Sequence, residues 1–568
     1  MIETIDAFDF EITEFDFDSF ALSEITKRNL YVSDLWPSVY ILISNEVMEA
    51  YVGESANIVN RLKNHLTHIA KSKLNKVFLI TSPSFNKSAT LDIESNLIKY
   101  FDADERYKLL NGNAGLASQN YYQKSLYGKV FIDIWGRLQT QQVTKAEISK
   151  LNNSDYFKYS PYKSLTAEQL ESVTTILELL VNRDKQSIFI KGSAGTGKTI
   201  VGIYLMKLLL TDISIYEDEN LDEDTLYLLE LVKRYKQKVP NPKLALVVPM
   251  TSLRDTLKKV FKGIKGLGAK NVIGPSQISD GNYDVLLIDE AHRLKRRKGI
   301  TNYRSHDDMN RLLGFDEEGT ELDWILKQSD NQLFFYDPLQ SIRPSDIPKE
   351  RFDSLLRQSA NSLIELKSQM RVLAGVDYID FVDRLLEGKL KEKELFVKNS
   401  QYQFYLFDDL AQMIGVLRKK EEKDGLSRLT AGFAWPWESR AKDIHDIEIQ
   451  GLKLNWNRVT SNWINSENAF SEVGCIHTTQ GYDLNYTGVI FGGEISYDPV
   501  KKEIIIKKEN YFDRNGKAGV EDPEILKEYI LNIYKTLMYR GIKGTYVYIV
   551  DKELRKYIGN HIMEYKYA

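Results

Sequence analysis

The sequence lacks the features of proteins held by disulfides or cysteine-bound zinc, of membrane-spanning proteins and of secreted proteins. It has one cysteine, Cys475, in 568 residues, which excludes an intramolecular disulfide and a zinc site built on several cysteines. No run approaches the roughly 20 consecutive apolar residues of a membrane-spanning helix, and the opening residues are acidic where a secretory signal is basic and then apolar. We therefore expect a cytoplasmic protein of a reducing compartment, without a membrane partner.

The sequence also lacks a strong net charge. Its 76 Lys and Arg residues stand against 80 Asp and Glu residues, for a formal net charge of -4. This balance excludes a global basic field, so any contact with nucleic acid must come from local patches. The composition is that of an ordinary globular protein, 43% hydrophobic and 27% charged, and the length predicts about three to four domains.

A glycine-rich stretch, QSIFIKGSAGTGKT at residues 186–199, organises the centre of the chain. It predicts a short strand, a loop and a helix from Ile200 to Leu210, and three glycines shape the loop: Gly192, Gly195 and Gly197. Glycine permits positive φ and lets backbone N–H groups approach phosphates closely. Lys198 supplies a positive charge and Thr199 a hydroxyl for Mg²⁺. The pattern predicts that the chain binds and hydrolyses ATP.

Two later stretches read as buried parallel strands that end in polar residues. Residues 284–293, DVLLIDEAHR, end in Asp289 and Glu290. With the phosphate loop in place, we expect Asp289 to hold Mg²⁺ through water and Glu290 to activate the attacking water. Residues 333–343, LFFYDPLQSIR, contain Gln340 three residues after an aspartate.

The spacing Asp-x-x-Gln resembles that of superfamily 1 helicases, and the resemblance covers residues 160–555. It implies that Gln340 senses the γ-phosphate of the nucleotide. It also implies that Gln169, which precedes the phosphate loop, reads the edge of the adenine base. The alternative is that Gln169 only caps the helix that begins at Thr166.

The second half of the chain resembles the remaining helicase motifs. Gln480 lies in a Thr-x-Gln-Gly turn that couples nucleotide and strand in that superfamily. Arg371 and Arg540 stand where helicases have arginines that complete the transition-state clamp, although Tyr539 precedes Arg540 where threonine or serine is common. These motifs, with the stretch GFAWPW, are most similar to bacterial ATPases related to the helicase part of Schlafen proteins.

A second pattern lies nearer the amino terminus. Two strands are expected at residues 39–43 and 50–52, followed by a helix that carries Arg61 and His65 on one face. The region resembles the GIY-YIG nucleases over residues 37–115. Ser38-Val39-Tyr40 stands where that family has Gly-Ile-Tyr, and Tyr51-Val52-Gly53 stands where it has Tyr-Ile-Gly. Glu94, on a helix expected from Leu91 to Phe101, matches the family's metal-binding glutamate.

The resemblance to GIY-YIG nucleases implies a role for each of these side chains. Glu94 would hold one divalent metal ion, Mg²⁺ or Mn²⁺, and Arg61 would neutralise charge on the phosphate. The residues that would align or deprotonate the water are Tyr40, Tyr51 and His65. Asn111 and Asn113 are both candidates for the family's asparagine, and the sequence does not choose between them.

The expected order of domains follows from these motifs. We expect an α/β chain with an acidic, aromatic segment (1–36), a small α+β GIY-YIG nuclease domain (37–125), a packed connector (126–159) and two RecA-like parallel-sheet domains (160–371 and 372–568). The acidic segment is interpreted either as a solvated face or as a mimic of nucleic acid. The basic run at 293–298 is interpreted as a phosphate contact or a solvated loop. Four tryptophans are interpreted as base-stacking or as core residues: Trp435, Trp437, Trp456 and Trp463.

The combined hypothesis is a motor coupled to a nuclease. The expected partner is nucleic acid, with DNA preferred and a single strand in the motor cleft, and a partner protein or self-association is a further option. Fusions of a nuclease with such a motor suggest a role in bacterial defence against phage or other foreign DNA, and this suggestion rests on analogy. The alternatives are an ATPase that gates the nuclease without processive movement, and a DNA repair nuclease.

Overall fold

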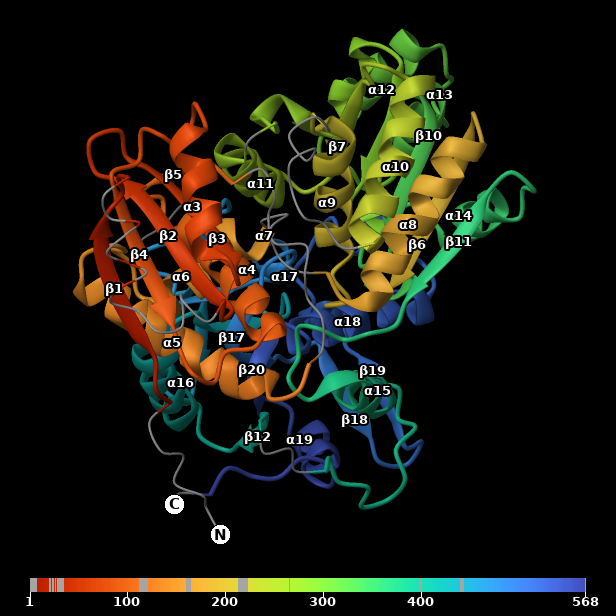
Figure 1. Cartoon of the computed structure of the whole chain (residues 1–568). Helices are drawn as coiled ribbons and strands as arrows, with labels where there is room; N and C mark the ends of the chain where they lie inside the picture. Colours follow the sequence, from red (N-terminus) through yellow and green to blue (C-terminus); the bar gives the residue numbers. More distant parts are fainter. Residues whose placement is uncertain are drawn as a thin grey trace. The chain divides into compact units, whose positions relative to one another are not determined.

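The computed structural model describes residues 8–19, 22, 25, 27, 35–111, 121–159, 165–212, 223–264, 266–397, 401–439 and 444–566. The chain is a mixed α/β protein with several sheets, and it divides into two compact units that are described separately (Figure 1). The first unit comprises Met1–Ala167 and Asp212–Leu229, and the second comprises Glu168–Thr211 and Glu230–Ala568. Among the described residues, no helix combines the length and apolarity needed to span a bilayer.

The first unit is built on a five-stranded sheet of order β1-β4-β2-β3-β5, coloured red to orange in Figure 1. Its strands are β1 (Glu11–Asp16), β2 (Ser38–Ser44), β3 (Glu49–Ser55), β4 (Lys76–Thr81) and β5 (Lys108–Leu109). Its first helices are α3 (Ile58–Thr67) and α4 (Lys87–Asp104). Alternation along β2 sends Val39 and Ile41 into the core that contains α4, while Tyr40 and Leu42 face the core that contains α3.

The acidic amino-terminal residues contribute to this sheet. The sequence pattern predicts a separate acidic segment over residues 1–36, but Glu11–Asp16 forms β1, which pairs antiparallel with β4. Phe15 and Phe17 are buried, whereas the acidic side chains at 11, 14, 16 and 18 are exposed. Among the described residues of this segment, the acidic side chains therefore form the solvated face of an edge strand, as one of the two interpretations expected.

The expected connector is helical. It contains α5 (Lys124–Thr140), α6 (Ile148–Asn153) and α7 (Asp155–Tyr159), and these helices share the α4 core of the first unit. Trp135 of α5 is buried and donates its indole N–H to the carbonyl of Ala146 at 3.0 Å. The carboxylate of Asp104, at the end of α4, accepts the N–H of Ala146 at 2.7 Å. These contacts make the segment a packed element of the first unit.

The second unit contains a six-stranded parallel sheet of order β11-β6-β10-β9-β7-β8. Its strands are β6 (Gln186–Gly192), β7 (Leu244–Val247), β8 (Val272–Ile273), β9 (Tyr283–Ile288), β10 (Ser329–Tyr336) and β11 (Ser362–Leu366). Its helices are α8 (Ala167–Asn182), α9 (Lys198–Leu210), α11 (Thr251–Gly263), α12 (Tyr303–Leu313), α13 (Glu321–Gln328) and α14 (Lys349–Leu356), while α10 (Glu223–Lys238) spans the division between the units. The central strands are continuous apolar runs because both faces of a parallel sheet are covered.

A seven-stranded sheet follows in the same unit, with the order β12-β20-β17-β13-β16-β15-β14. It is parallel except for the β14–β15 pair. Its strands are β12 (Gln403–Phe407), β13 (Ser427–Ala431), β14 (Ile447–Ile449), β15 (Leu452–Trp456), β16 (Glu472–Gly474), β17 (Leu484–Phe491) and β20 (Gly541–Ile549). The remaining elements are α15 (Gly375–Leu386), α16 (Leu410–Asp424), α17 (Ile476–Thr479), α18 (Pro523–Met538), α19 (Lys552–Gly559) and the hairpin of β18 (Ile495–Asp498) and β19 (Glu503–Ile506).

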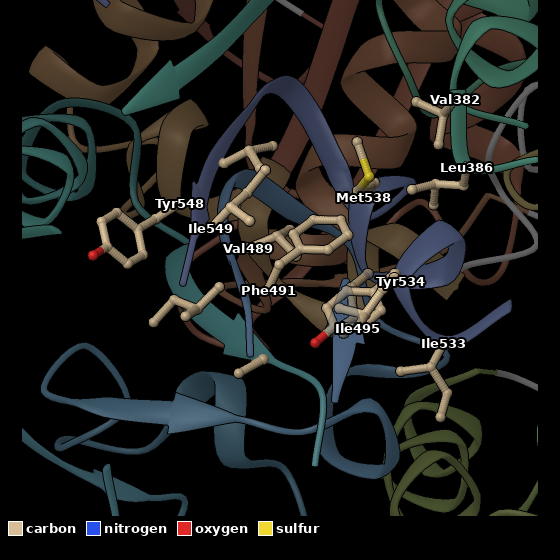
Figure 2. Close-up of a cluster of buried hydrophobic side chains, with 14 of the residues drawn as sticks. Val382, Leu386, Val489, Phe491, Ile495, Ile533, Tyr534, Met538, Tyr548 and Ile549 are labelled. Carbon is tan, nitrogen blue, oxygen red and sulfur yellow. The ribbon is translucent and has the colours of Figure 1, made fainter. Parts of the chain in front are cut away.

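The core of this second sheet combines aliphatic residues with aromatic ones such as Phe491, Tyr534 and Tyr548 (Figure 2). Phe491 of β17 stacks on Tyr534 of α18 with ring centroids 4.1 Å apart. Trp456 and Trp463 are fully buried, which fits the core interpretation of these tryptophans and contradicts base stacking for the pair. The packing joins α18 to β17, and α18 ends at Met538, two residues before Arg540.

Candidate functional site

The loop between β6 and α9 has the backbone geometry of a phosphate-binding loop. Gly195 and Gly197 adopt φ of 89° and 81°, a region that favours glycine. Gly192, for which positive φ was also expected, ends β6 without it, and a Cβ there would lie 2.5 Å from the hydroxyl of Thr196. Gly195 and Gly197 therefore provide the positive φ of the turn, and Gly192 leaves room for the side chain of Thr196.

Lys198 and Thr199 open α9 directly after this loop. The ammonium of Lys198 donates to the carbonyls of Gly192 and Ser193 at 2.6 and 3.0 Å. The hydroxyl of Thr199 donates to both carboxylate oxygens of Asp289, at 2.9 and 3.1 Å. Burial and the neighbouring Glu290 raise the pKa of Asp289. A hydroxyl and a carboxylate in contact beside a phosphate loop are the oxygen donors that suit hydrated Mg²⁺.

Glu290 follows Asp289 in a strained backbone conformation, with φ of 50°. Its Oε2 lies 3.0 Å from Nε2 of the buried His292. Burial acts to raise the pKa of Glu290, but the adjacent His292, with the positive charges of Lys198 and Arg540, lowers it. Glu290 is therefore held as a carboxylate, the form that orients or activates water.

Gln340 lies in the turn after β10, as the spacing predicts. Its amide N–H donates to Asp337 at 2.6 Å, while its Oε1 is buried without a hydrogen-bond partner among the described residues. The N–H of Asp337 in turn donates to Nδ1 of His292 at 3.4 Å. His292 thus joins the glutamate after β9 to the turn after β10, a link that the sequence analysis did not assign.

Gln169 lies against the phosphate loop. Its amide N–H donates to the carbonyl of Thr196 at 3.0 Å, and a Cβ on Gly197 would collide with the same amide. Gln169 is fully buried. Gln169 therefore lies beside the loop that is expected to bind the phosphates of ATP.

The segment from Gln369 to Arg371 also packs against the loop, and Met370 contacts Gln169. The amide of Gln369 donates to the carbonyl of Ala194 at 2.6 Å, and its oxygen accepts the N–H of Arg371 at 2.8 Å. The N–H of Met370 donates to the carbonyl of Gly195 at 3.0 Å. The guanidinium of Arg371 pairs with Asp483, while its Nη1 is buried without a hydrogen-bond partner in the described part of the chain.

Arg540 and Gln480 come from the second sheet of the same unit. Arg540 is buried, donates to the carbonyl of Tyr482 at 3.2 Å, and lies near enough to Glu290 to lower its pKa. Both amide atoms of Gln480 are buried without hydrogen-bond partners among the described residues. Arg371 thus lies against Gly195 of the phosphate loop, and Arg540 lies near Glu290.

This arrangement matches a known family of proteins. A family model described as Schlafen group 3, DNA/RNA helicase domain, matches residues 185–551 of the 568. The chain belongs to this family. Its second unit accordingly contains a Schlafen-type, helicase-like P-loop ATPase region, which confirms the expected resemblance to the helicase part of Schlafen proteins.

Individual relatives are more distant. An uncharacterized protein of Saccharomyces cerevisiae is 26% identical over 401 residues, which cover 65% of this chain and 82% of that protein. A Pif1 helicase from Bacteroides, solved with ADP-AlF3 and single-stranded DNA, has 9% identity and a TM-score of 0.26 and covers 70% of this chain and 94% of its own. An arterivirus helicase, nonstructural protein 10 with DNA, has 12% identity and a TM-score of 0.27 and covers 69% of this chain and 65% of its own. The family assignment comes from the domain match alone.

The Schlafen-type helicase domain also contains a partly buried charge network that no sequence motif predicts. Arg343 donates to Asp513 at 3.1 Å and to Nε2 of His477, which lies 3.4 Å from the same aspartate. Burial and the charge of Arg343 lower the pKa of His477 to about 4, so this imidazole is neutral at physiological pH. The three residues lie far apart in the sequence and carry no common motif.

Arg293 has neither of the roles expected for the basic run, whereas Lys295 and Lys298 are exposed, as on a solvated loop. Arg293 is buried and pairs with Asp346 at 2.6 Å, and Arg297 donates to both oxygens of Asp307 at 2.7 and 3.0 Å. Neither a phosphate contact nor a solvated loop describes Arg293. These cations neutralise carboxylates of the fold instead.

The first unit brings Tyr40, Tyr51, Arg61 and His65 into one cluster. The hydroxyl of Tyr40 and Nε2 of His65 are hydrogen-bonded at 2.8 Å, and the rings of Tyr51 and His65 meet edge to face at 4.9 Å. Burial acts to lower the pKa of Arg61, but the adjacent hydroxyls of Tyr40 and Tyr51 outweigh it and raise that pKa. Gly53 lies opposite Tyr40 in the β2–β3 pair, and a Cβ there would overlap the phenol.

Two pKa shifts define the protonation of this cluster. Burial and the charge of Tyr51 raise the pKa of Tyr40 well above its usual value, so the phenol stays protonated. Burial and the charge of Lys71 lower the pKa of His65 to about 3, so the imidazole stays neutral. Glu94 of α4 is half-buried and lies near enough to raise the pKa of Tyr40 further.

Asn111 has a structural contact with this cluster. Its amide pairs with the backbone of Val52, donating to the carbonyl at 2.7 Å and accepting the N–H at 3.0 Å. Asn111 therefore holds the strand that carries Tyr51, whereas Asn113 lies outside the described residues. In the described part of the chain, no group of three or more His, Cys, Asp or Glu side chains is placed to hold a metal ion.

The packing of the phosphate loop leads to a prediction about Gly195. A methyl group at Gly195→Ala would collide with Gln369, lie 2.7 Å from Cβ of Arg371, and require an L residue at a φ of 89°. We expect the variant to bind a fluorescent ATP analogue at least about tenfold more weakly. Gly415→Ala, in α16 with no atom within 4 Å of the added methyl group, is the matched control. Equal affinities of the two variants would contradict the assigned loop.

Proposed function

We propose that the chain couples an ATP-driven, helicase-type motor to a metal-dependent GIY-YIG endonuclease that cuts nucleic acid, with DNA as the preferred substrate. The observation that carries the proposal is the presence in one chain of two separate clusters. One surrounds the phosphate loop of the Schlafen-type domain, and the other joins Tyr40, Tyr51, Arg61 and His65. Defence against phage or other foreign DNA is the role we propose for this combination.

In the proposed motor, ATP supplies the bond that is hydrolysed, and Mg²⁺ would contact Thr199 and Asp289. The loop N–H groups and Lys198 bind the phosphates, and Glu290 orients the water. Arg371 and Arg540 lie close to the phosphate loop and Glu290 and would stabilise charge on the γ-phosphate. The match to a DNA/RNA helicase domain supports nucleic acid as the partner that this hydrolysis moves.

In the proposed nuclease, a divalent ion at Glu94 would polarise the phosphate. Arg61 neutralises charge on the phosphate oxygens. The low pKa of His65 makes it a weak base, so its contribution is to orient the hydroxyl of Tyr40 and not to accept a proton. Tyr40 and Tyr51, both within reach of Arg61, align the attacking water.

Plasmid cleavage with separate variants of the two sites tests this proposal. We expect Glu94→Gln to abolish Mg²⁺-dependent cleavage while ATP hydrolysis continues, because only the nuclease carboxylate is lost. We expect Glu290→Gln to lower ATP hydrolysis by about 10² or more while its Mg²⁺-dependent cleavage without ATP equals that of wild type.

The same assay separates the alternatives. Cleavage that survives Glu94→Gln would contradict the nuclease site. ATP hydrolysis that is not stimulated by single-stranded DNA would contradict the translocating motor and favour an ATPase that gates the nuclease.

The neutral state of His65 predicts the pH dependence of cleavage. Its pKa is lowered, to about 3, so the imidazole gains no proton as the pH falls from about 8 to 5. We expect the cleavage rate to show no inflection near the ordinary histidine pKa. His65→Ala should lower the rate about 10²-fold at every pH by releasing Tyr40. An inflection near pH 6.5 in wild type that disappears in His65→Gln would contradict this role.

A further inference from the structure

Residues 481–483, which connect α17 to β17, contact three different parts of the second unit. Gly481 has a φ of 87° and lies against Leu253 of α11. The hydroxyl of Tyr482 lies between two hydroxyls of the same helix, 2.8 Å from Ser252 and 2.9 Å from Thr256, and donates to the carbonyl of Ser252 at 3.1 Å. Tyr482 is almost fully buried. This short segment is therefore fastened to α11.

The same residues hold both candidate arginines. The carbonyl of Tyr482 accepts a hydrogen bond from Arg540 at 3.2 Å, and the carboxylate of Asp483 pairs with Arg371. Arg371 and Arg540 are 169 positions apart in the sequence (540 − 371 = 169), yet they contact two adjacent residues, Asp483 and Tyr482. Contacts that hold residues 481–483 in place therefore also help to hold both arginines in place.

The anchoring helix is itself connected to the hydrolytic carboxylates. α11 begins four residues after the end of β7, and β7 pairs with β9, which ends immediately before Asp289 and Glu290. The N–H of Asp289 donates to the carbonyl of Val247, the last residue of β7, at 3.0 Å. The hydroxyl of Tyr482 therefore joins the arginine-bearing segment to the strand pair that carries the carboxylates.

We infer that Tyr482 is the positioning residue that sets Arg371 and Arg540 relative to Asp289 and Glu290, through its hydrogen bonds to Ser252 and Thr256 of α11. The inference rests on the proposed ATP hydrolysis and adds a residue to that site. Tyr482 acts through the arginines, so its contribution falls on the rate of hydrolysis and not on the affinity for ATP. No motif used in the sequence analysis assigns this residue.

Steady-state ATP hydrolysis tests the inference. Tyr482→Phe keeps the ring and removes only the hydroxyl, which leaves the buried hydroxyl of Thr256 and the half-buried hydroxyl of Ser252 without this partner. We expect kcat to fall about tenfold while KM for ATP changes by less than about twofold. Tyr486→Phe is the matched control because Tyr486 is also buried, in β17, and its ring packs on Tyr546 away from α11. This control should equal wild type.

A double-mutant cycle distinguishes positioning from simple loss of stability. Ser252→Ala/Thr256→Val removes the two side-chain partners, and we expect the same fall in kcat as for Tyr482→Phe. Combining all three substitutions should lower kcat no further, because the hydroxyls act as one unit. Falls in kcat that multiply in the triple variant, or that follow a lowered thermal midpoint of unfolding, would overturn the inference.

The outcomes separate the inference from the function on which it rests. If wild type hydrolyses ATP no faster than Lys198→Ala, the proposed ATPase function fails and the inference fails with it. If wild type is active and Tyr482→Phe has the same kcat as Tyr486→Phe, only the role of Tyr482 is contradicted.

Discussion

The packing of the phosphate-binding loop against residues 369–371 is the constraint on which the rest of the motor depends. Gln369 donates to one loop carbonyl, Met370 donates to the next, and no side chain fits at Gly195 between them. This contact gives the loop its shape and places Arg371 against it. Arg371 then reaches Asp483 of the second sheet, so the contact that shapes the loop also connects the two sheets of the second unit.

Features that depend on local pattern were predictable from the sequence. Buried parallel strands are apolar runs that end at polar residues, so β6, β9 and β10 and the positions of Asp289 and Gln340 followed from residue order. Tyr40 and Tyr51 likewise lie on the expected strands. The acidic strand β1 was missed because its charges suggested a separate segment, although buried Phe15 and Phe17 alternate with exposed carboxylates.

Features that depend on long-range contact were not predictable. Arg343, His477 and Asp513 come from separate stretches of the sequence, and no spacing links the three of them. Asn111 could not be assigned from spacing, because its contact with the backbone of Val52 joins residues 59 positions apart. Arg293 is basic like its neighbours, but its burial beside Asp346 could not be read from composition.

The cluster around the phosphate loop lies in the second unit of the chain, and the cluster around Tyr40 lies in the first. The family match to a Schlafen-type helicase domain covers the phosphate-loop cluster. A crystallographic map of the chain with Mg²⁺ and a nonhydrolysable ATP analogue tests that cluster most directly. The account predicts density for the phosphates along Gly195–Gly197, with the metal ion beside Thr199 and Asp289. Phosphate density elsewhere in the chain, with this loop empty, would contradict it.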